Sequence, residues 1–300
     1  MKTERPTILV TGSRGQLGCE VSAALRRFGN VIALDRATLD LADPDAIVER
    51  IRSIAPALIV NAAAYTAVDR AERERDAAFV VNARAPEIIA EEAKRAGALL
   101  IHYSTDYVFD GTQRTPYDES AIPNPQNVYG DSKLAGERAI ASSGAAAIVL
   151  RTSWVYSLRG SNFLLTIRRL AAERDELRIV DDQTGVPNWA RDLADATAAL
   201  VERGLPYLAE RAGLYHITAS GTATWYAFAR EIVASETKRI VPITTDQYPT
   251  PARRPAYSVL DPSRLARTFG IVLRDWRAAL KDCVTSDIDP TSALGRSTLQ

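Results

Sequence analysis

Short runs of apolar, often β-branched residues recur along the first half of the chain. They are typical of strands buried on both faces, because no regular polar position interrupts them. The runs span residues 7–10, 31–34, 58–60, 99–101 and 147–150. Apolar residues three and four positions apart predict helices between them, over 16–28, 44–54, about 71–95 and 129–142. This alternation predicts an α/β fold with a Rossmann-like, doubly wound parallel sheet.

The pattern becomes less regular after about residue 152. It predicts helices over 163–173, 191–203, 225–235 and 275–283, and strands over 177–180 and 214–217. Prolines crowd residues 242–262, which we expect to form an ordered, irregular loop around a ligand, and the polar tail from 288 on is expected to be disordered. We therefore expect two domains. A dinucleotide-binding domain covers 1–155 and is completed by parts of about 175–222, and a smaller mixed C-terminal substrate domain covers 156–174 and 223–300.

Composition narrows the function. The 300 residues carry 37 Lys and Arg against 37 Asp and Glu, so the chain lacks the broad basic field of a nucleic-acid-binding protein. Its two Cys are far apart and it has only two His, which argues against a zinc cluster or a disulfide framework. Neither a targeting segment nor a membrane-spanning run is evident, so we expect a cytoplasmic protein with no membrane partner.

A glycine-rich turn follows the first predicted strand and opens the next helix. Its glycines allow a sharp bend and close approach of a pyrophosphate, and a helix N-terminus favours an anion. The expected cofactor-binding residues here are Gly12, Arg14, Gly15, Gln16, Leu17 and Gly18. Small residues close the third strand at Ala62, Ala63 and Ala64, where the backbone can also approach the cofactor.

The end of the second strand is where a dinucleotide fold reads the adenosine ribose. Asp35 suits the 2′-hydroxyl of NAD, whereas Arg36 suits the 2′-phosphate of NADP. We favour NADPH, because Arg36 can reach the phosphate while Asp35 turns away, and we expect NADH to be usable as well. Asp40 and Leu41 are expected to flank the adenine, although a plain surface turn remains an alternative.

Tyr129 and Lys133 carry the clearest catalytic signal. Residues four apart share one face of a helix, and a neighbouring ammonium lowers the pKa of a phenol, so this pair can donate and accept a proton. Thr105 follows a predicted strand and can donate a hydrogen bond to a substrate carbonyl beside Tyr129. His102, in the middle of that strand, is expected to be a buried structural residue.

These motifs together resemble the extended short-chain dehydrogenase/reductases that modify nucleotide sugars. From residue 7 to about 280 the chain is similar, more narrowly, to the dTDP-4-dehydrorhamnose reductases. The motifs that carry the narrower resemblance lie at residues 15–18, 61–69, 104–111, 127–133, 151–156, 182–187, 213–216 and 249–255.

The resemblance implies NADPH-dependent reduction of the 4-keto group of dTDP-4-dehydro-L-rhamnose to dTDP-L-rhamnose, the last step in making this sugar donor. It implies that Thr105, Tyr129 and Lys133 are catalytic, with Tyr129 as the proton donor. The substrate contacts that it implies are Ser104, Thr105, Asp106, Tyr107, Tyr129, Trp154, Asn162, Gln183, Arg253 and Arg254.

One position departs from the family pattern. Some members form a magnesium-linked dimer through two acidic side chains; Glu20 fits the first position, but Arg191 occupies the second and has no acceptor atom. We therefore expect no stoichiometric magnesium, and a monomer or a weak homodimer.

Two rival functions remain: another nucleotide-sugar reductase, epimerase or dehydratase, and a non-catalytic regulatory subunit. Tyr107 stands where the dehydratases have a Glu, and the presence of Thr105, Tyr129 and Lys133 together disfavours the regulatory subunit.

Overall fold

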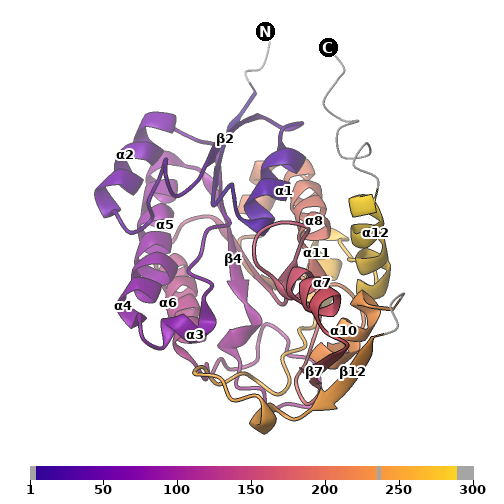
Figure 1. The fold of residues 1–300 in the computed structure, drawn as a ribbon. Helices are drawn as coiled ribbons and strands as arrows, with labels where there is room; N and C mark the ends of the chain where they lie inside the picture. The colour runs from indigo at the N-terminus through magenta and orange to yellow at the C-terminus, as the bar shows by residue number, and fades with distance from the viewer. Residues whose placement is uncertain (1–4, 235–237, 289–300) are drawn as a thin grey trace.

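A six-stranded parallel sheet forms the centre of the computed structural model, which describes residues 5–234 and 238–288 (Figure 1). Its strand order is β10-β5-β4-β3-β1-β2, so the chain winds outward in both directions from the centre. The strands are β1 (Thr7–Thr11), β2 (Asn30–Leu34), β3 (Leu58–Asn61), β4 (Leu99–Thr105), β5 (Ala147–Thr152) and β10 (Gly213–His216). This arrangement confirms the predicted α/β class, and the five early strands lie where the apolar runs placed them.

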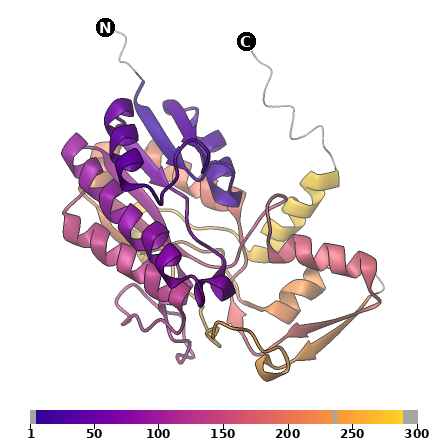
Figure 2. The same ribbon diagram turned by 60° about the vertical axis from the view of Figure 1, so that its left-hand side comes forward.

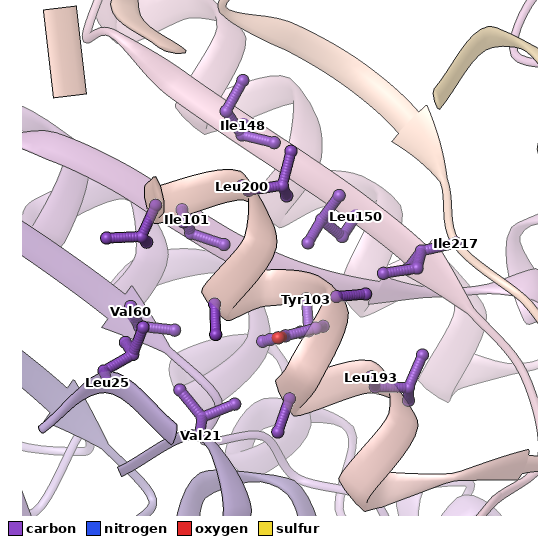
Figure 3. Packing of buried hydrophobic residues seen from close by; sticks show 14 of the residues in the cluster. Val21, Leu25, Val60, Ile101, Tyr103, Ile148, Leu150, Leu193, Leu200 and Ile217 are labelled. Carbon is purple, nitrogen blue, oxygen red and sulfur yellow. The ribbon is translucent and has the colours of Figure 1, made fainter. Parts of the chain in front are cut away.

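Helices cover both faces of the sheet because successive strand residues point to opposite sides. Leu9 belongs to a core cluster with residues of α2 (Pro44–Ile54), α5 (Ala85–Ala96) and α6 (Val128–Ser143). Its neighbours Ile8 and Val10 belong to another, with residues of α1 (Gln16–Leu25), α8 (Ala190–Glu202) and α11 (Ser263–Phe269). Figure 3 shows Leu193 and Leu200 of α8 facing Ile101 and Leu150 of the sheet. Both faces of the sheet are therefore buried, as the uninterrupted apolar runs predict.

The helix predicted over 71–95 is divided. It consists of α3 (Val68–Ala71), α4 (Arg75–Phe79), a π-helical turn (Val80–Arg84) and α5. Asn82 in that turn is buried, and its side chain accepts from the backbone N–H of Tyr65 and donates to the Tyr65 carbonyl. The irregular turn thus fixes the segment that follows β3 at the carboxyl edge of the sheet.

A second, smaller lobe has its own core beside the sheet (Figure 2). It contains α7 (Phe163–Glu173), α10 (Trp225–Ile232), α12 (Trp276–Ile288) and the parallel pair of β7 (Glu176–Val180) with β12 (Arg239–Ile243). β7 therefore lies with the smaller core, although it falls within the stretch predicted to complete the first domain, and α11 lies with the larger one. The exact division into two domains stays a prediction.

Short elements connect these layers. They are β6 (Val155–Tyr156), β8 (Thr184–Gly185), β9 (Asn188–Trp189), α9 (Leu205–Ala209), β11 (Ala223–Thr224), and 3₁₀ turns at Asp106–Val108 and Thr245–Gln247. From residue 248 to the start of α11 the chain has no regular element, in agreement with the expected proline-rich loop. The expected disordered tail lies, beyond residue 288, outside the described residues. Along the described part of the chain, no helix is both long and apolar enough to cross a lipid bilayer.

Candidate active site

The carboxyl end of β4 and the first turn of α6 bring Thr105 and Tyr129 together. Asn127 caps α6 by accepting from the backbone N–H of Gly130 at 2.8 Å. A Cβ on Gly130 would lie 2.1 Å from the carbonyl oxygen of Tyr107, so only glycine allows α6 to approach this segment so closely. As a result the ring of Tyr129 meets that of Tyr107 edge to face, with centroids 5.7 Å apart.

The phenol of Tyr129 is held in its neutral form. Burial raises its pKa to about 12, a hydrogen bond with Thr105 opposes the rise, and the charge of Asp106 adds to it. This differs from the lowered pKa that the Tyr129 and Lys133 spacing predicts. The reason is geometric: Nζ of Lys133 is turned toward the interior instead of toward the phenol. A neutral phenol of this kind is a proton donor.

Lys133 is almost fully buried beside β4. Its Nζ donates to the carbonyl oxygen of Tyr103 at 2.6 Å and lies 3.2 Å from Nε2 of His102. Burial lowers the pKa of Lys133 to about 8, against an opposing contribution from Glu137. The lysine can therefore change its charge within the range of pH in which enzymes work.

The residues that flank Thr105 face different partners. Ser104 donates to Glu137, which also receives two hydrogen bonds from Arg151, so its hydroxyl is engaged behind the site. Asp106 is buried next to Thr105, and burial raises the pKa of its carboxyl to about 6. One of its oxygens, Oδ2, meets no hydrogen-bond geometry within the described residues, although Ser258 is close enough to the carboxyl to oppose the rise in its pKa. The geometry thus leaves Asp106, and not Ser104, with an acceptor to offer.

The glycine-rich turn is pressed against the end of β3. Gly12 has φ of 70°, and a Cβ there would lie 2.8 Å from Cα of Ala63. A Cβ on Gly18 would lie 2.2 Å from the carbonyl oxygen of Gly12, and Gly15 donates its N–H to that same oxygen at 2.8 Å. The turn, the N-terminus of α1 and Ala62–Ala64 therefore form one cradle of bare backbone, which suits a pyrophosphate.

Two members of this turn have further roles. Leu17 is buried in the larger core and contributes packing. Gln16 accepts through Oε1 from Nδ2 of Asn162 at 2.8 Å, and Asn162 in turn caps α7 by accepting from Leu165. Nδ2 of Asn162 also donates to the carbonyls of Ser157 and Arg159, so in the free protein its amide serves the cap and these local contacts. The predicted contact of Asn162 with substrate stays a prediction.

Charged residues gather at the end of β2. The carboxylate of Asp35 accepts from the backbone N–H and from the hydroxyl of Thr38. It also forms an ion pair with Arg14 at 2.7 Å. These contacts hold the pKa of Asp35 below its usual range, the bond with the Thr38 hydroxyl contributing most. Arg36 is largely exposed and lies 3.5 Å from Asp40. The guanidinium groups of Arg14 and Arg36 therefore lie near the end of β2, where the sequence predicts the adenosine ribose. Leu41 is buried in the core.

Two tryptophans form a wall beside the end of β5. Trp154 adopts a left-handed backbone conformation with φ of 44°, and its ring stacks on that of Trp225 at a centroid distance of 3.5 Å. Gln183 is buried, accepts from Nε1 of Trp225 and donates to Thr245. Strain of this kind in a bulky residue persists only where the surroundings enforce it. Gln183 therefore holds the Trp225 ring in place against Trp154.

Arg253 and Arg254 lie in the proline-rich loop but differ in environment. Arg254 forms a bidentate pair with Asp69 at 2.7 and 3.0 Å. Burial acts to lower its pKa, but the hydrogen bond to Asp69 and the charges of the neighbouring Asp69, Tyr107 and Tyr248 together raise it. Arg253 is exposed, and its backbone carbonyl accepts from Asn127. The loop is thereby joined both to α3 and to the cap of α6, next to the tyrosine.

Several residues of the site carried no catalytic prediction from sequence. Trp225 and Asp69 make side-chain contacts to predicted site residues more than 40 positions away, and His102 was assigned only a structural role. Asn127 could have been found from sequence, because Asn directly before a helical pattern is a common N-cap.

The residues present fit a dinucleotide. The backbone cradle at Gly12 and Ala63 has the shape that a pyrophosphate needs, and Arg14 and Arg36 offer cations for a ribose phosphate. At the position considered for magnesium, Glu20 pairs with Arg191 at 3.3 Å. The described residues hold no group of three metal-ligating side chains.

A cavity of about 460 Å³ lies elsewhere, between α10, β12 and α12. Its lining includes Tyr226, Arg230 and Arg277 and none of the predicted site residues. The predicted catalytic and cofactor-binding residues therefore locate the candidate site, and this cavity does not.

Comparison with known proteins agrees with this geometry. The family model described as the RmlD substrate binding domain matches residues 6–288. The dTDP-4-dehydrorhamnose reductase of Burkholderia thailandensis is 48% identical over 290 residues, covering 92% of this chain and 97% of that protein. That of Escherichia coli K12 is 44% identical, covering 91% of this chain and 95% of that protein.

Solved structures give the same result. A dTDP-4-dehydrorhamnose reductase from Bacillus anthracis in complex with NADP is 33% identical, with a TM-score of 0.88 over 94% of this chain and 99% of that one. A UDP-glucose 4-epimerase from Thermus thermophilus, 21% identical with a TM-score of 0.73 over 88% of this chain and 93% of that one, shares the fold alone. The chain therefore belongs to the family of dTDP-4-dehydrorhamnose reductases, defined by the RmlD substrate binding domain.

Proposed function

We propose that this protein reduces the 4-keto group of dTDP-4-dehydro-L-rhamnose to give dTDP-L-rhamnose, with NADPH as the preferred reductant and NADH as a usable one. The observation that carries the proposal is the neutral, buried phenol of Tyr129 bonded to Thr105, one helical turn from Lys133. The dTDP-4-dehydrorhamnose reductases to which the chain is similar support the choice of substrate.

The protonation state of Tyr129 suits a reduction. NADPH, when bound, supplies the hydride. Tyr129 keeps its proton until an alkoxide develops on the substrate, because its pKa is raised to about 12. It then donates that proton to the sugar oxygen, while the Thr105 hydroxyl, which donates to Oδ1 of Asp106 at 3.1 Å in the free protein, turns to donate to the same oxygen. A neutral phenol is the protonation state that a reduction needs.

The remaining residues have binding roles in this proposal. The backbone cradle of the glycine-rich turn and Ala62–Ala64 holds the pyrophosphate, Arg14 and Arg36 hold the ribose phosphate, and Lys133 holds the nicotinamide ribose. Trp154, supported by Trp225, walls the sugar, and the free oxygen of Asp106 accepts from a sugar hydroxyl. Arg253 is placed to bind the diphosphate, whereas Arg254 already pairs with Asp69 and orders the loop.

Tyr129→Phe tests the proposal directly. The variant removes the proton donor and keeps the ring, so we expect kcat to fall roughly 10²- to 10⁴-fold while NADPH still binds. Activity is measured as NADPH oxidation with dTDP-4-dehydro-L-rhamnose, and the product is identified by NMR. Tyr207→Phe is the matched control, because it removes a phenol hydroxyl that contacts the carbonyl of Thr268, outside the predicted site. Wild-type turnover by Tyr129→Phe would show that the mechanism is wrong, and absence of turnover in the wild type would refute the function.

A further inference from the structure

A chain of buried polar groups runs behind Lys133 across three neighbouring strands. Nζ of Lys133 lies 3.2 Å from Nε2 of His102, and Nδ1 of His102 lies 3.0 Å from Nδ2 of Asn61. Oδ1 of Asn61 accepts from the hydroxyl of Thr11 at 2.7 Å. All four side chains are at most 2% exposed, and the parallel pairing of β1, β3 and β4 aligns three of them. Buried polar groups of this kind must satisfy one another.

The backbone determines the direction of these hydrogen bonds. The N–H of Ala63 can only donate, and it donates to Oδ1 of Asn61 at 3.3 Å, as the Thr11 hydroxyl also does. The amide nitrogen of Asn61 therefore faces His102, and because this nitrogen is a donor, Nδ1 of His102 must accept. A neutral imidazole carries a single N–H, so that hydrogen sits on Nε2 and is directed at Lys133. Burial is the largest cause of the lowered pKa of His102, so the ring stays neutral.

An N–H donor next to Nζ discriminates between the two forms of a lysine. An ammonium has three donors and no acceptor, whereas an amine has a lone pair that accepts. The other groups around Nζ do not reverse this preference. The carbonyl of Tyr103 accepts from either form. Glu137, on the same helix, favours the charged form, but its carboxylate is already bound to Arg151 and Ser104.

We propose that His102, held in its Nε2–H tautomer by Asn61, is a positioning residue for Lys133: its N–H binds Nζ and favours the uncharged amine in the free protein. The inference rests on the proposed function in one respect: that function gives Lys133 its task of holding the nicotinamide ribose. It assigns a role to a histidine that its mid-strand position alone marks as structural.

Magnetic resonance on the free protein tests the tautomer without any assay of turnover. The chain contains two histidines, His102 and His216, so ¹⁵N-histidine labelling gives two resolvable rings. We expect His102 to show a protonated Nε2 and an unprotonated Nδ1. Asn61→Asp replaces the amide donor by a carboxylate acceptor of the same shape, and we expect it to move the proton to Nδ1. A wild-type His102 protonated on Nδ1 would overturn the proposal, as would an Nε2–H tautomer that persists in Asn61→Asp.

Magnetic resonance also measures the effect of His102 on the charge of Lys133. The chain has five lysines, Lys2, Lys94, Lys133, Lys238 and Lys281, so ¹³Cε labelling follows each one through a pH titration. We expect His102→Phe to raise the titration midpoint of Lys133 by at least one pH unit, because the donor that opposes the ammonium is gone. His216→Phe is the matched control: it removes another fully buried imidazole of the same sheet, and we expect no shift at Lys133.

The outcomes are separable. An unchanged or lowered midpoint in His102→Phe would overturn the proposal, as would an equal shift in His216→Phe. If His102→Phe does not fold, the wild-type tautomer and the Asn61→Asp response still decide the question. Because each measurement is made on the free protein, failure of the proposed reaction leaves these results unaffected, and the two failures are distinguishable.

Discussion

Tyr129 and Lys133 lie one helical turn apart, yet Nζ of Lys133 binds the carbonyl of Tyr103 and lies next to His102. The phenol consequently keeps a pKa near 12, set mainly by its burial. The same burial brings the pKa of Lys133 down to about 8. For these two residues, the loss of hydration outweighs the charge interaction that their spacing suggests.

A pH dependence follows for cofactor binding. The ammonium of Lys133 is present below about pH 8 and is lost as the pH rises through that value. If the ammonium holds the nicotinamide ribose, the dissociation constant for NADPH should rise above pH 8, as measured by fluorescence titration. Tyr129 does not ionise in this range. In Lys133→Met we expect weaker binding with no inflection near pH 8, and an inflection that survives in this variant would contradict the assignment.

The preference for NADPH is also a property of single residues. In Arg36→Ala we expect the KM for NADPH to rise roughly tenfold, because a charge-assisted hydrogen bond contributes about 1.5 kcal/mol and 1.4 kcal/mol corresponds to a factor of ten. The KM for NADH should change less than about twofold. Arg50→Ala, an exposed arginine on α2, is the control. An equal loss with both cofactors would show that Arg36 does not read the phosphate.

At the scale of elements, the loop between β1 and α1 depends on close contact with the end of β3. Gly12 meets the backbone of Ala62 and Ala63, and Gly18 meets that of Gly12. These contacts set how near α1 comes to the sheet, and so where the N-terminal amides of the helix point. The cradle therefore depends on packing between the glycine-rich turn, the start of α1 and the residues after β3.

Two glycine substitutions separate these effects. Gly12→Ala requires both a left-handed φ and a Cβ against Ala63, so we expect unfolding by urea to show a loss of about 2 to 3 kcal/mol, together with loss of NADPH binding. Gly97→Ala, at the end of α5, has a similar φ of 65° and open space around the Cβ. It should cost about 1 kcal/mol and leave NADPH binding unchanged. Equal effects would show that the contact with Ala63 is unimportant.

At the scale of the whole molecule, contacts between distant segments assemble the site. Asp69 binds Arg254, 185 positions along the chain, and Gln183 holds Trp225 against Trp154. Both contacts join the region of the sheet to the smaller lobe or to the proline-rich loop. The substrate side of the site therefore exists only when these parts are folded together.

The prediction of no stoichiometric magnesium also belongs to this scale. Glu20 pairs with Arg191 of its own chain, which places a cation where a shared metal would need a second acid. We expect sedimentation equilibrium to give the same monomer or weak homodimer with EDTA and with added magnesium. A dimer that dissociates on chelation would contradict this prediction. Arg191→Ala is a useful companion, because it removes the cation and leaves Glu20 in place.

The apolar runs determined the five early strands and the parallel sheet, because burial on both faces leaves a local signature that sequence shows directly. The glycine spacing, Thr105 and the Tyr129 and Lys133 pair were likewise predictable, since each lies within a few residues of a strand end or a helix start. The burial of Tyr129, the contact of His102 with Lys133 and the tryptophan wall were decided only by the tertiary structure. Hydration, hydrogen-bond direction and ring stacking depend on neighbours contributed by other elements, and the order of residues along a chain does not specify which atoms will meet.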